Sequence, residues 1–466
     1  MSTGKSFFFV GIGGSGMMPL AMILAGQGAT VAGSDRSLDQ DRLPAKFDQL
    51  RAMGIALFPQ DGSGIISADQ IVIASAAIEA TVPDMIAADR VGATRMSRAQ
   101  LLSDLFNAAP QAIGVAGTSG KSTVTGMIGW MLQALGRNPT VMNGAVMKNF
   151  AHADAPFASA LVGAGDLFVS EVDESDGSIA LYQPAVAVLN NVSLDHKSLD
   201  ELRALFADFI GRAGHAIVNI DNPDAEVLAA ALPVDRATRF SIERAADLQA
   251  IFIEEKPFGV DFLVTEADLI VEVTLQVPGR HNVANALAAI GAVRAVGVSL
   301  HEAAAALAGF AGLKRRFDLV GQVNDIAVID DFGHNPDKIA ATLETLHAFA
   351  GRLLILFQPH GYGPLKVMRH ELVASLVAHM APDDLLVLPD PVYHGGTVTR
   401  EVTSADIIAD IAATGRHARH IPQRDEAAAW LVDQAQPGDR IIVMGARDDT
   451  LSQLAANMVT ALASRG

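Results

Sequence analysis

The chain has 466 residues, enough for about three domains at roughly 150 residues each. Half of the residues are hydrophobic and only 18% are charged, which excludes a disordered or fibrous protein. The net charge of -18 argues against nucleic acid and anionic membranes as partners, and the absence of cysteine excludes disulfides, thiolate zinc sites and a cysteine nucleophile.

The first apolar stretch, residues 7–26, carries no charge and could be mistaken for a signal peptide or a membrane-spanning helix. Four glycines and Pro19 interrupt it and would weaken an isolated helix. We therefore predict a strand, a glycine turn and a helix at this end. No other segment of the sequence has membrane-spanning character, so we expect a cytoplasmic protein, which the lack of cysteine also fits.

Short apolar runs alternate with helical patterns over the first half of the chain. Strands are expected within 7–14, 30–35 and 70–78, with a helix at 17–28. The same rhythm returns in strands within 112–117, 166–173 and 185–193, and in a helix that follows residue 123. This βαβ pattern predicts parallel sheets with helices on both faces.

The pattern changes after residue 240, where two-residue alternation up to residue 279 predicts antiparallel strands. A helix is expected at 282–297. From about residue 314 a third α/β unit follows, with strands within 325–336, 351–361, 383–391 and 439–449. We place the domain boundaries so that the domains are 1–107, 108–312 and 313–466.

A glycine-rich loop follows the first predicted strand and opens a helix: Gly11, Ile12, Gly13, Gly14, Ser15 and Gly16. Its glycines let backbone amides approach a diphosphate at the helix N-terminus. Asp35 ends the second strand, where an acidic residue could bind a ribose hydroxyl. The motif suits any nucleotide diphosphate, and a tight turn without a ligand is the alternative.

A second loop lies between an apolar strand and a helix: Gly117, Thr118, Ser119, Gly120, Lys121, Ser122 and Thr123. Backbone amides and Lys121 would hold the β- and γ-phosphates of ATP, and the hydroxyl of Ser122 or Thr123 would bind Mg²⁺. The loop departs from the usual Walker spacing, because Val115 stands where that motif has its first glycine. The alternative is a glycine turn with a solvated lysine.

Polar residues follow three further predicted strands. Four acids occur in EVDESD (171–176), an Asp-His pair ends at His196, and DDFGHNP (330–336) follows a strand of the third unit, which begins near Arg315 and Arg316. Ligands bind at the carboxyl ends of parallel strands, so an Mg²⁺ site beside the ATP loop is favoured over a solvated acidic loop. Two nucleotide loops on separate domains predict an ATP-driven enzyme with two substrates.

Ten motifs, taken in chain order, resemble those of the Mur ligases of peptidoglycan synthesis. They are GIGGSGM at 11–17, SAAI at 75–78, GTSGKST at 117–123, NGAVMK at 143–148, EVDESD at 171–176, the Asp-His pair at 195–196, PGRHNVANALAA at 278–289, RRFD at 315–318, DDFGHNP at 330–336 and FQPH at 357–360. The resemblance covers essentially the whole chain, and the alanine-adding members are the most similar.

The resemblance implies an α/β protein of three domains. These are a Rossmann-like domain for a UDP-sugar, a central P-loop ATPase domain with a parallel sheet and a smaller antiparallel part, and a Rossmann-like C-terminal domain for the amino acid. It implies ATP and Mg²⁺ as cofactors and UDP-N-acetylmuramate and an amino acid as partners. The oligomeric state stays open between monomer and dimer.

The resemblance also implies roles for individual residues. The UDP-sugar would contact Gly11, Gly13, Gly14, Ser15, Gly16, Asp35, Ser75, His281 and Asn285. ATP would contact Gly117, Thr118, Ser119, Gly120, Lys121, Ser122, Thr123, Asn282, Arg316 and Asp331. Mg²⁺ would be held by Ser122, Thr123, Glu171 and His196. The catalytic residues would be Lys121, Glu171, His196 and His334, the last of these facing the amino acid.

The implied activity joins an amino acid, L-alanine first, to the carboxylate of UDP-N-acetylmuramate through an acyl phosphate. Three departures bear on the amino acid: Ser119 stands where the alanine-adding members have histidine, Gly361 where they have arginine, and the stretch 390–396 differs. A ligase for another amino acid or for a recycled peptide therefore stays open. An NAD-dependent dehydrogenase would explain only the first domain, and the presence of Lys121, Glu171 and His196 argues against a non-catalytic partner protein.

Overall fold

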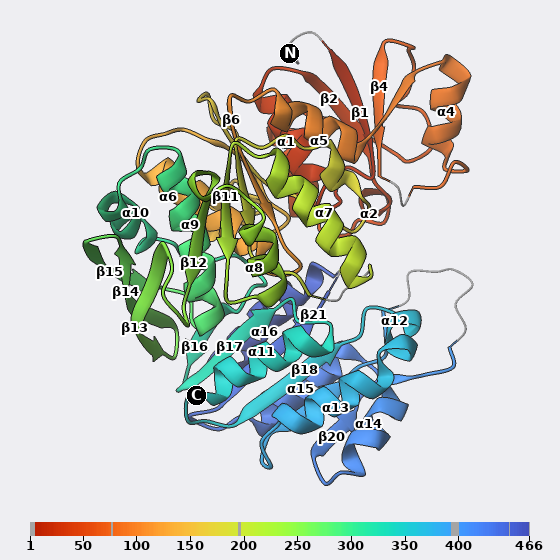
Figure 1. The fold of residues 1–466 in the computed structure, drawn as a ribbon. Helices are drawn as coiled ribbons and strands as arrows, with labels where there is room; N and C mark the ends of the chain where they lie inside the picture. The colour runs from red at the N-terminus through yellow and green to blue at the C-terminus, as the bar shows by residue number, and fades with distance from the viewer. Residues whose placement is uncertain (1–4, 76–77, 194–196, 393–399, 447, 466) are drawn as a thin grey trace. The chain divides into compact units, whose positions relative to one another are not determined.

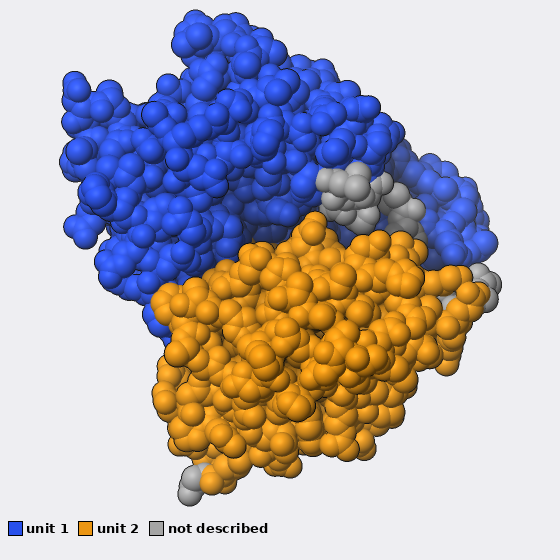
Figure 2. Space-filling view, turned by 60° about the horizontal axis from the view of Figure 1, so that its bottom comes forward, with its two compact units in different colours: residues 1–312 blue, residues 313–466 orange. Residues whose placement is uncertain are grey.

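The computed structural model describes residues 5–75, 78–193, 197–392, 400–446 and 448–465. The chain forms two compact units, Met1–Gly312 and Leu313–Gly466, which Figure 2 colours separately. The first unit contains two sheets, one in each of the regions 1–107 and 108–312, and the second unit contains one. Helices and strands alternate in all three regions (Figure 1), which confirms the predicted α/β class.

The first sheet is parallel, with the strand order β3-β2-β1-β4-β5 of a Rossmann-type half. Alternate side chains of β1 face opposite sides. Phe7 and Phe9 belong to the core that contains α1, α3 and α5, whereas Phe8 and Val10 pack with α4. The elements are β1 (Ser6–Val10), α1 (Met18–Gly26), β2 (Thr30–Ser34), α2 (Arg36–Asp39), α3 (Pro44–Ala52), β3 (Ala56–Phe58), β4 (Gln70–Ala74), α4 (Pro83–Val91), β5 (Thr94–Ser97) and α5 (Arg98–Asn107).

The central sheet has ten strands in the order β15-β14-β13-β12-β11-β10-β6-β9-β7-β8. Strands β13, β14 and β15 pair antiparallel, as the alternation after residue 240 predicted. Helices α7 and α8 cover one face, and α6, α9 and α10 the other (Figure 1). The elements are β6 (Gln111–Ala116), α6 (Lys121–Ala134), β7 (Thr140–Met142), η1 (Lys148–Phe150), β8 (Ala160–Leu161), β9 (Leu167–Glu171), η2 (Ser178–Leu181), β10 (Val186–Leu189), α7 (Leu199–Arg212), β11 (His215–Asn219), α8 (Pro223–Ala230), η3 (Val234–Arg236), β12 (Ala237–Ser241), β13 (Leu248–Lys256), β14 (Gly259–Glu266), β15 (Leu269–Leu275), α9 (Arg280–Ala295) and α10 (Leu300–Leu307).

One hydrophobic core extends from the first sheet into the central sheet. Phe106 of α5 packs edge-on against Phe168 of β9, at 6.0 Å between ring centroids, and against Tyr182, at 5.1 Å. The backbone N–H of Phe157 also donates to Oε1 of Gln49 on α3, at 2.9 Å. These contacts join the first sheet, which carries the loop after β1, to the central sheet, which carries the loop after β6.

The second unit has one sheet, with the strand order β16-β17-β21-β18-β19-β20. Strand β16 pairs antiparallel with β17, and the other pairs are parallel. In the described part of the whole chain, no helix combines the length and apolar character needed to cross a membrane. The elements are β16 (Asp318–Val323), β17 (Ile326–Asp331), α11 (Pro336–His347), β18 (Leu353–Gln358), α12 (Tyr362–Val367), α13 (Arg369–His379), β19 (Leu385–Leu388), α14 (Ser404–Ala412), β20 (His417–His420), α15 (Arg424–Gln434), β21 (Arg440–Gly445) and α16 (Thr450–Ala463).

Replacing Phe106 by alanine tests the shared core. We expect Phe106→Ala to lower the free energy of unfolding of the first unit by about 3–5 kcal/mol, because Phe106 is fully buried between the two sheets. Phe252→Ala is the matched control, since Phe252 is 80% exposed and its loss should change stability by less than about 0.5 kcal/mol. Urea unfolding of the full chain measures both, and equal losses would contradict a shared core.

Candidate functional site

The backbone amides of the first glycine loop divide into two groups. The first four, from Gly11 to Gly14, donate hydrogen bonds of 2.8–3.1 Å to acceptors on Gly11, Ser34 and Asp35. The next two residues, Ser15 and Gly16, line a cavity. Most of the first amides are therefore satisfied by Ser34 and Asp35, and the last residues of the loop, just before α1, border the cavity.

Asp35 holds this loop in place. Its Oδ2 accepts from the N–H of Gly13 at 2.8 Å, its Oδ1 accepts from the N–H of Ser37 at 2.7 Å, and the residue is 8% exposed. Gly13 is also held through its carbonyl, which accepts from Nζ of Lys46 at 3.0 Å. Each carboxylate oxygen of Asp35 thus accepts one protein N–H, and the ribose contact predicted from the sequence stays a prediction.

The second loop is tied to the residues after β10. The N–H of Ser119 donates to Oδ1 of Asn191 at 2.8 Å, and Nδ2 of Asn190 donates to the carbonyl of Ser119 at 3.1 Å. Gly120 has a φ of +86°, and a Cβ there would collide with the amides of Asn190 and Asn285. The loop thus requires glycine at this position, both for its backbone conformation and for space.

Lys121 begins α6 and is held from two sides. Its Nζ donates to the carbonyl of Gly117 and to Oε2 of Glu174, each at 2.8 Å. Glu174 is 5% exposed, so this is a shielded ion pair. An ammonium group has three N–H donors, and these two contacts leave one for a ligand.

Asn282 and Asn285 lie behind the second loop, on α9. Nδ2 of Asn190 donates to Oδ1 of Asn285 at 2.8 Å, and Nδ2 of Asn285 donates to Oδ1 of Asn282 at 3.0 Å. Both residues are buried, whereas His281 at the start of the helix is exposed. The sugar contacts implied for His281 and Asn285 remain predictions, and the structure places Asn285 against the second loop.

Two oxygen donors of the predicted metal site meet. The hydroxyl of Ser122 donates to Oε2 of Glu171 at 2.8 Å, and a Cβ on Gly144 would collide with the same carboxylate. Among the described residues, no group of three or more His, Asp or Glu side chains could hold a metal by itself. Mg²⁺ commonly takes one or two carboxylates together with substrate phosphates, so the donor set fits this ion. Thr123 is half-buried beside it, and His196 lies outside the described residues.

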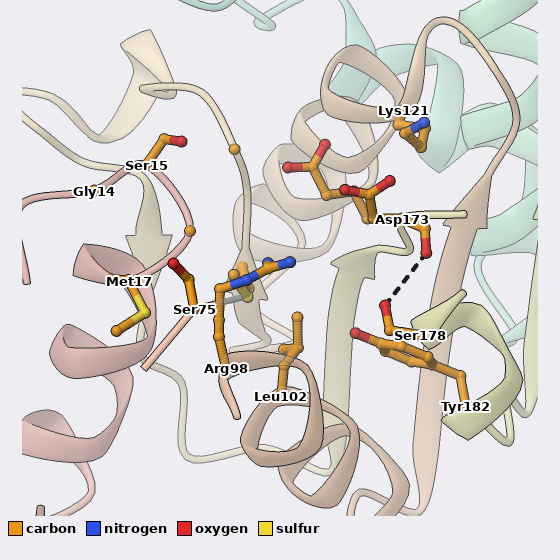
Figure 3. A pocket seen from close by; sticks show the side chains of 14 residues that line it. Gly14, Ser15, Met17, Ser75, Arg98, Leu102, Lys121, Asp173, Ser178 and Tyr182 are labelled. Carbon is orange, nitrogen blue, oxygen red and sulfur yellow. Dashed lines mark hydrogen bonds between the residues drawn. The ribbon is translucent and has the colours of Figure 1, made fainter. Parts of the chain in front are cut away.

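The end of the first loop and Lys121 of the second loop border one cavity of about 380 Å³. Figure 3 shows Ser15 and Met17 on one side of it and Lys121 and Asp173 on the other. Its lining residues come from both sheets of the first unit: Gly14, Ser15, Gly16, Met17, Ser75, Arg98, Leu102, Lys121, Met142, Gly144, Glu171, Asp173, Ser178 and Tyr182. The structure thus brings predicted residues of both loops, together with Ser75 and Glu171, to one space.

Several lining residues, such as Arg98 and Tyr182, belong to none of the motifs recognised in the sequence. Asp173 belongs to the acidic cluster noted in the sequence. Burial acts to raise the pKa of Asp173, but hydrogen bonding from Ser175 and the charges of Lys121 and Arg98 outweigh it and lower the pKa. The cavity therefore holds an ionised carboxylate beside two cations.

Three predicted residues of the second unit gather around Phe332. The guanidinium of Arg316 stacks on the Phe332 ring at 4.1 Å, and Asp331 accepts from the N–H groups of Phe317 and Gly333 at 2.8 and 2.7 Å. Nδ1 of His334 lies 2.8 Å from the carbonyl of Phe332. A carbonyl only accepts, so Nδ1 carries the proton and Nε2 has the free lone pair.

The departures from the alanine-adding pattern also lie in the second unit. Gly361 has a φ of +150°, a conformation that side-chain-bearing residues rarely adopt. The nearby cations are paired: Nζ of Lys366 lies 2.5 Å from Glu401, and Nε of Arg369 lies 2.8 Å from Asp410. Of the differing stretch 390–396, residues 393–396 lie outside the described residues, as do Ala76 and Ala77 of the SAAI motif.

Three family models match consecutive parts of the chain. The Mur ligase family catalytic domain matches residues 6–109, the Mur ligase middle domain matches 115–293, and the Mur ligase glutamate ligase domain matches 315–447. Together they cover all three sheets.

Curated relatives match over nearly their full length. A UDP-N-acetylmuramate–L-alanine ligase of Cereibacter sphaeroides is 34% identical, over 98% of this chain and 96% of the relative, and one of Streptomyces coelicolor is 34% identical over 95% of each. Among solved structures, the UDP-N-acetylmuramate-alanine ligase of Thermotoga maritima has a TM-score of 0.81 at 24% identity, over 99% of this chain and all of that one. A murein peptide ligase of Psychrobacter arcticus has a TM-score of 0.72 at 26% identity, over 99% of each chain.

The protonation of His334 gives a test by pH. Burial, together with the nearby charge of Lys338, lowers its pKa to about 4 from the ordinary 6.5. Between these values the unfolded chain binds a proton that the folded chain does not, so this group lowers stability as pH falls from 6.5 towards 4, by at most about 3 kcal/mol.

We expect His334→Gln to flatten the pH dependence of the unfolding free energy between pH 7 and pH 5, measured by urea unfolding. His417→Gln is the control, because His417 is an exposed histidine of the same unit, and this variant should keep the wild-type slope. An unchanged slope in His334→Gln would contradict the buried neutral state.

Proposed function

The chain belongs to the Mur ligase family, and we propose that it joins L-alanine to the carboxylate of UDP-N-acetylmuramate at the expense of ATP, in peptidoglycan synthesis. The observation that carries the proposal is the cavity shared by the two loops, because a nucleotide-diphosphate loop and an ATP loop open onto one space of about 380 Å³. Residues 1–107 would bind the UDP-sugar, 108–312 ATP and 313–466 the amino acid. Because both nucleotide substrates belong to the cytoplasm, the reaction would take place there.

The chemistry needs two bond-forming steps. An oxygen of the muramyl carboxylate attacks the γ-phosphorus of ATP, the bond to the β-phosphate oxygen breaks, and ADP leaves. The amine of L-alanine then attacks the acyl carbon, the amide bond forms, and phosphate leaves as the nitrogen gives up a proton. Each step brings negative charges together, so cations placed before the reaction begins lower the barrier.

Lys121 would supply the protein's own positive charge to the phosphates. Gly117 and Glu174 already fix its ammonium group at the mouth of the loop, so its remaining N–H can reach a phosphate oxygen without further ordering. Ser122 and Glu171 would hold Mg²⁺, with Thr123 and His196 as the further ligands implied by the resemblance. When bound, Mg²⁺ neutralises charge on the phosphate oxygens.

The remaining assigned residues keep the roles that the family resemblance implies. The UDP-sugar would contact Gly11, Gly13, Gly14, Ser15, Gly16, Asp35, Ser75, His281 and Asn285. Asn282 would contact ATP, as would Arg316 and Asp331 of the second unit, and His334, neutral at pH 7, would face the amino acid.

A dehydrogenase is disfavoured by the same geometry. It would use the first loop alone and would leave Lys121, Ser122 and Glu171, which the structure brings together at the second loop, without a role. The departures at Ser119, Gly361 and 390–396 leave one question within the family, namely which amine is added. L-alanine is favoured by the curated relatives, and a larger amine or a peptide is the alternative outcome of the test below.

Phosphate release with ATP, Mg²⁺, UDP-N-acetylmuramate and each amino acid in turn tests the proposed reaction. We expect release with L-alanine, and reduced efficiency with glycine and L-serine, because a pocket that differs by one small group discriminates by only about 1–3 kcal/mol. If phosphate is released only with a larger amino acid or with the L-alanyl-γ-D-glutamyl-diaminopimelate peptide, that amine and not L-alanine is the substrate. No release with any of them would contradict ligase activity.

Lys121→Ala tests the phosphate loop. We expect turnover to fall by on the order of 100-fold or more with the fold intact, because the charge of Lys121 acts more strongly on the crowded transition state than on bound ATP. Lys256→Ala, which removes an exposed lysine on the β13–β14 hairpin, should keep wild-type turnover. Steady-state phosphate release measures both, and near-normal turnover in a folded Lys121→Ala protein would overturn the assignment.

A further inference from the structure

Arg98 is a cation of the cavity that none of the motifs explains. Among the described lining residues the cationic side chains are Lys121 and Arg98. Arg98 is the first residue of α5, whose N-cap Ser97 accepts from the N–H of Gln100 at 3.0 Å, and the first turn has no acidic residue. The N-terminus is the positive end of the helix dipole. The charge of Arg98 adds to it, so positive potential is concentrated at this point of the cavity.

The side chain of Arg98 packs directly against the first glycine loop. A Cβ built on Gly16 would lie 3.0 Å from Nη1 and 3.1 Å from Cδ of Arg98. A side chain at position 16 would therefore require the arginine to shift by a few tenths of an ångström. Figure 3 shows the guanidinium extending from α5 into the space between Ser75 and Asp173. Arg98 and the exposed end of the loop, Ser15 and Gly16, thus border the same part of the cavity.

The carboxylate paired with Arg98 makes only a weak contact. Nη2 of Arg98 lies 3.5 Å from Oδ2 of Asp176, beyond the usual length of a charge-assisted hydrogen bond, and the arginine side chain is 23% exposed. Asp176 is itself held by the N–H of Ser178, which donates to its Oδ1 at 2.9 Å. A guanidinium has five N–H donors in a planar fork, so this single contact leaves most of the fork for a ligand.

We propose that Arg98 binds the diphosphate of the nucleotide sugar, together with the loop residues Ser15 and Gly16. The inference rests on the proposed function, which places a UDP-sugar in this cavity. A planar guanidinium fork matches phosphate oxygens in a way that a lysine does not, and the contact with Gly16 puts the fork at the diphosphate loop. In the free protein the weak contact with Asp176 leaves the guanidinium available to the diphosphate.

Binding of two sugar nucleotides, measured by calorimetry with the full chain, tests this role. Both compounds contain the same UDP diphosphate, but only UDP-N-acetylmuramate has a carboxylate. We expect Arg98→Ala to weaken binding of both by a similar factor, about 10- to 100-fold, because each loses the same charged contact. Arg98→Lys should recover part of the loss, and ATP affinity should stay unchanged in both variants.

Arg51→Ala is the matched control, because Arg51 is an exposed arginine on α3 paired with Asp48 outside the cavity. It should bind both sugar nucleotides as the wild type does. Weakened binding of UDP-N-acetylmuramate alone would show that Arg98 contacts the carboxylate and would overturn the diphosphate assignment, as would unchanged binding of both. If the wild-type protein bound neither sugar nucleotide, the proposed function itself would fail.

Discussion

The packing of Phe106 against Phe168 and Tyr182 is the contact on which the geometry of the site depends. Each of the two sheets can form a glycine loop by itself, but two loops act on one pair of substrates only if their positions are fixed relative to each other. The shared core provides that constraint, because aromatic rings buried edge-on resist sliding and separation. Tyr182 also lines the cavity, so the contact that joins the sheets forms part of the cavity wall.

The two loops use glycine for different physical reasons. In the first loop the early amides donate mainly to Ser34 and Asp35, and Gly16 leaves room for Arg98. In the second loop Gly120 accommodates a positive φ and the amides of Asn190 and Asn285. In both cases the missing side chain leaves space for a neighbouring polar group, which is Arg98 of the cavity in the first loop and the buried amides behind the loop in the second.

Paired charges explain how an acidic protein forms a site for anionic substrates. The chain carries a net charge of -18, yet the cavity presents Lys121 and Arg98. Glu174 and Asp176, two residues apart, each pair with one of these cations. The short pair with Glu174 fixes Lys121 and offsets part of the cost of burying it, whereas the longer contact with Asp176 leaves Arg98 available to a ligand.

The sequence by itself determined the α/β class, the strand-loop-helix character of both nucleotide loops, the antiparallel strands after residue 240 and the family. These features are local or periodic, and glycine spacing and alternating apolar residues encode them directly. Tertiary structure alone decided that the two loops share a cavity, that Asp35 serves the loop, that Glu174 holds Lys121 and that Arg98 enters the site. Those facts depend on contacts between residues as far apart as Arg98 and Asp176, or Lys121 and Glu174, and such long-range contacts form only when the sheets pack on a common core.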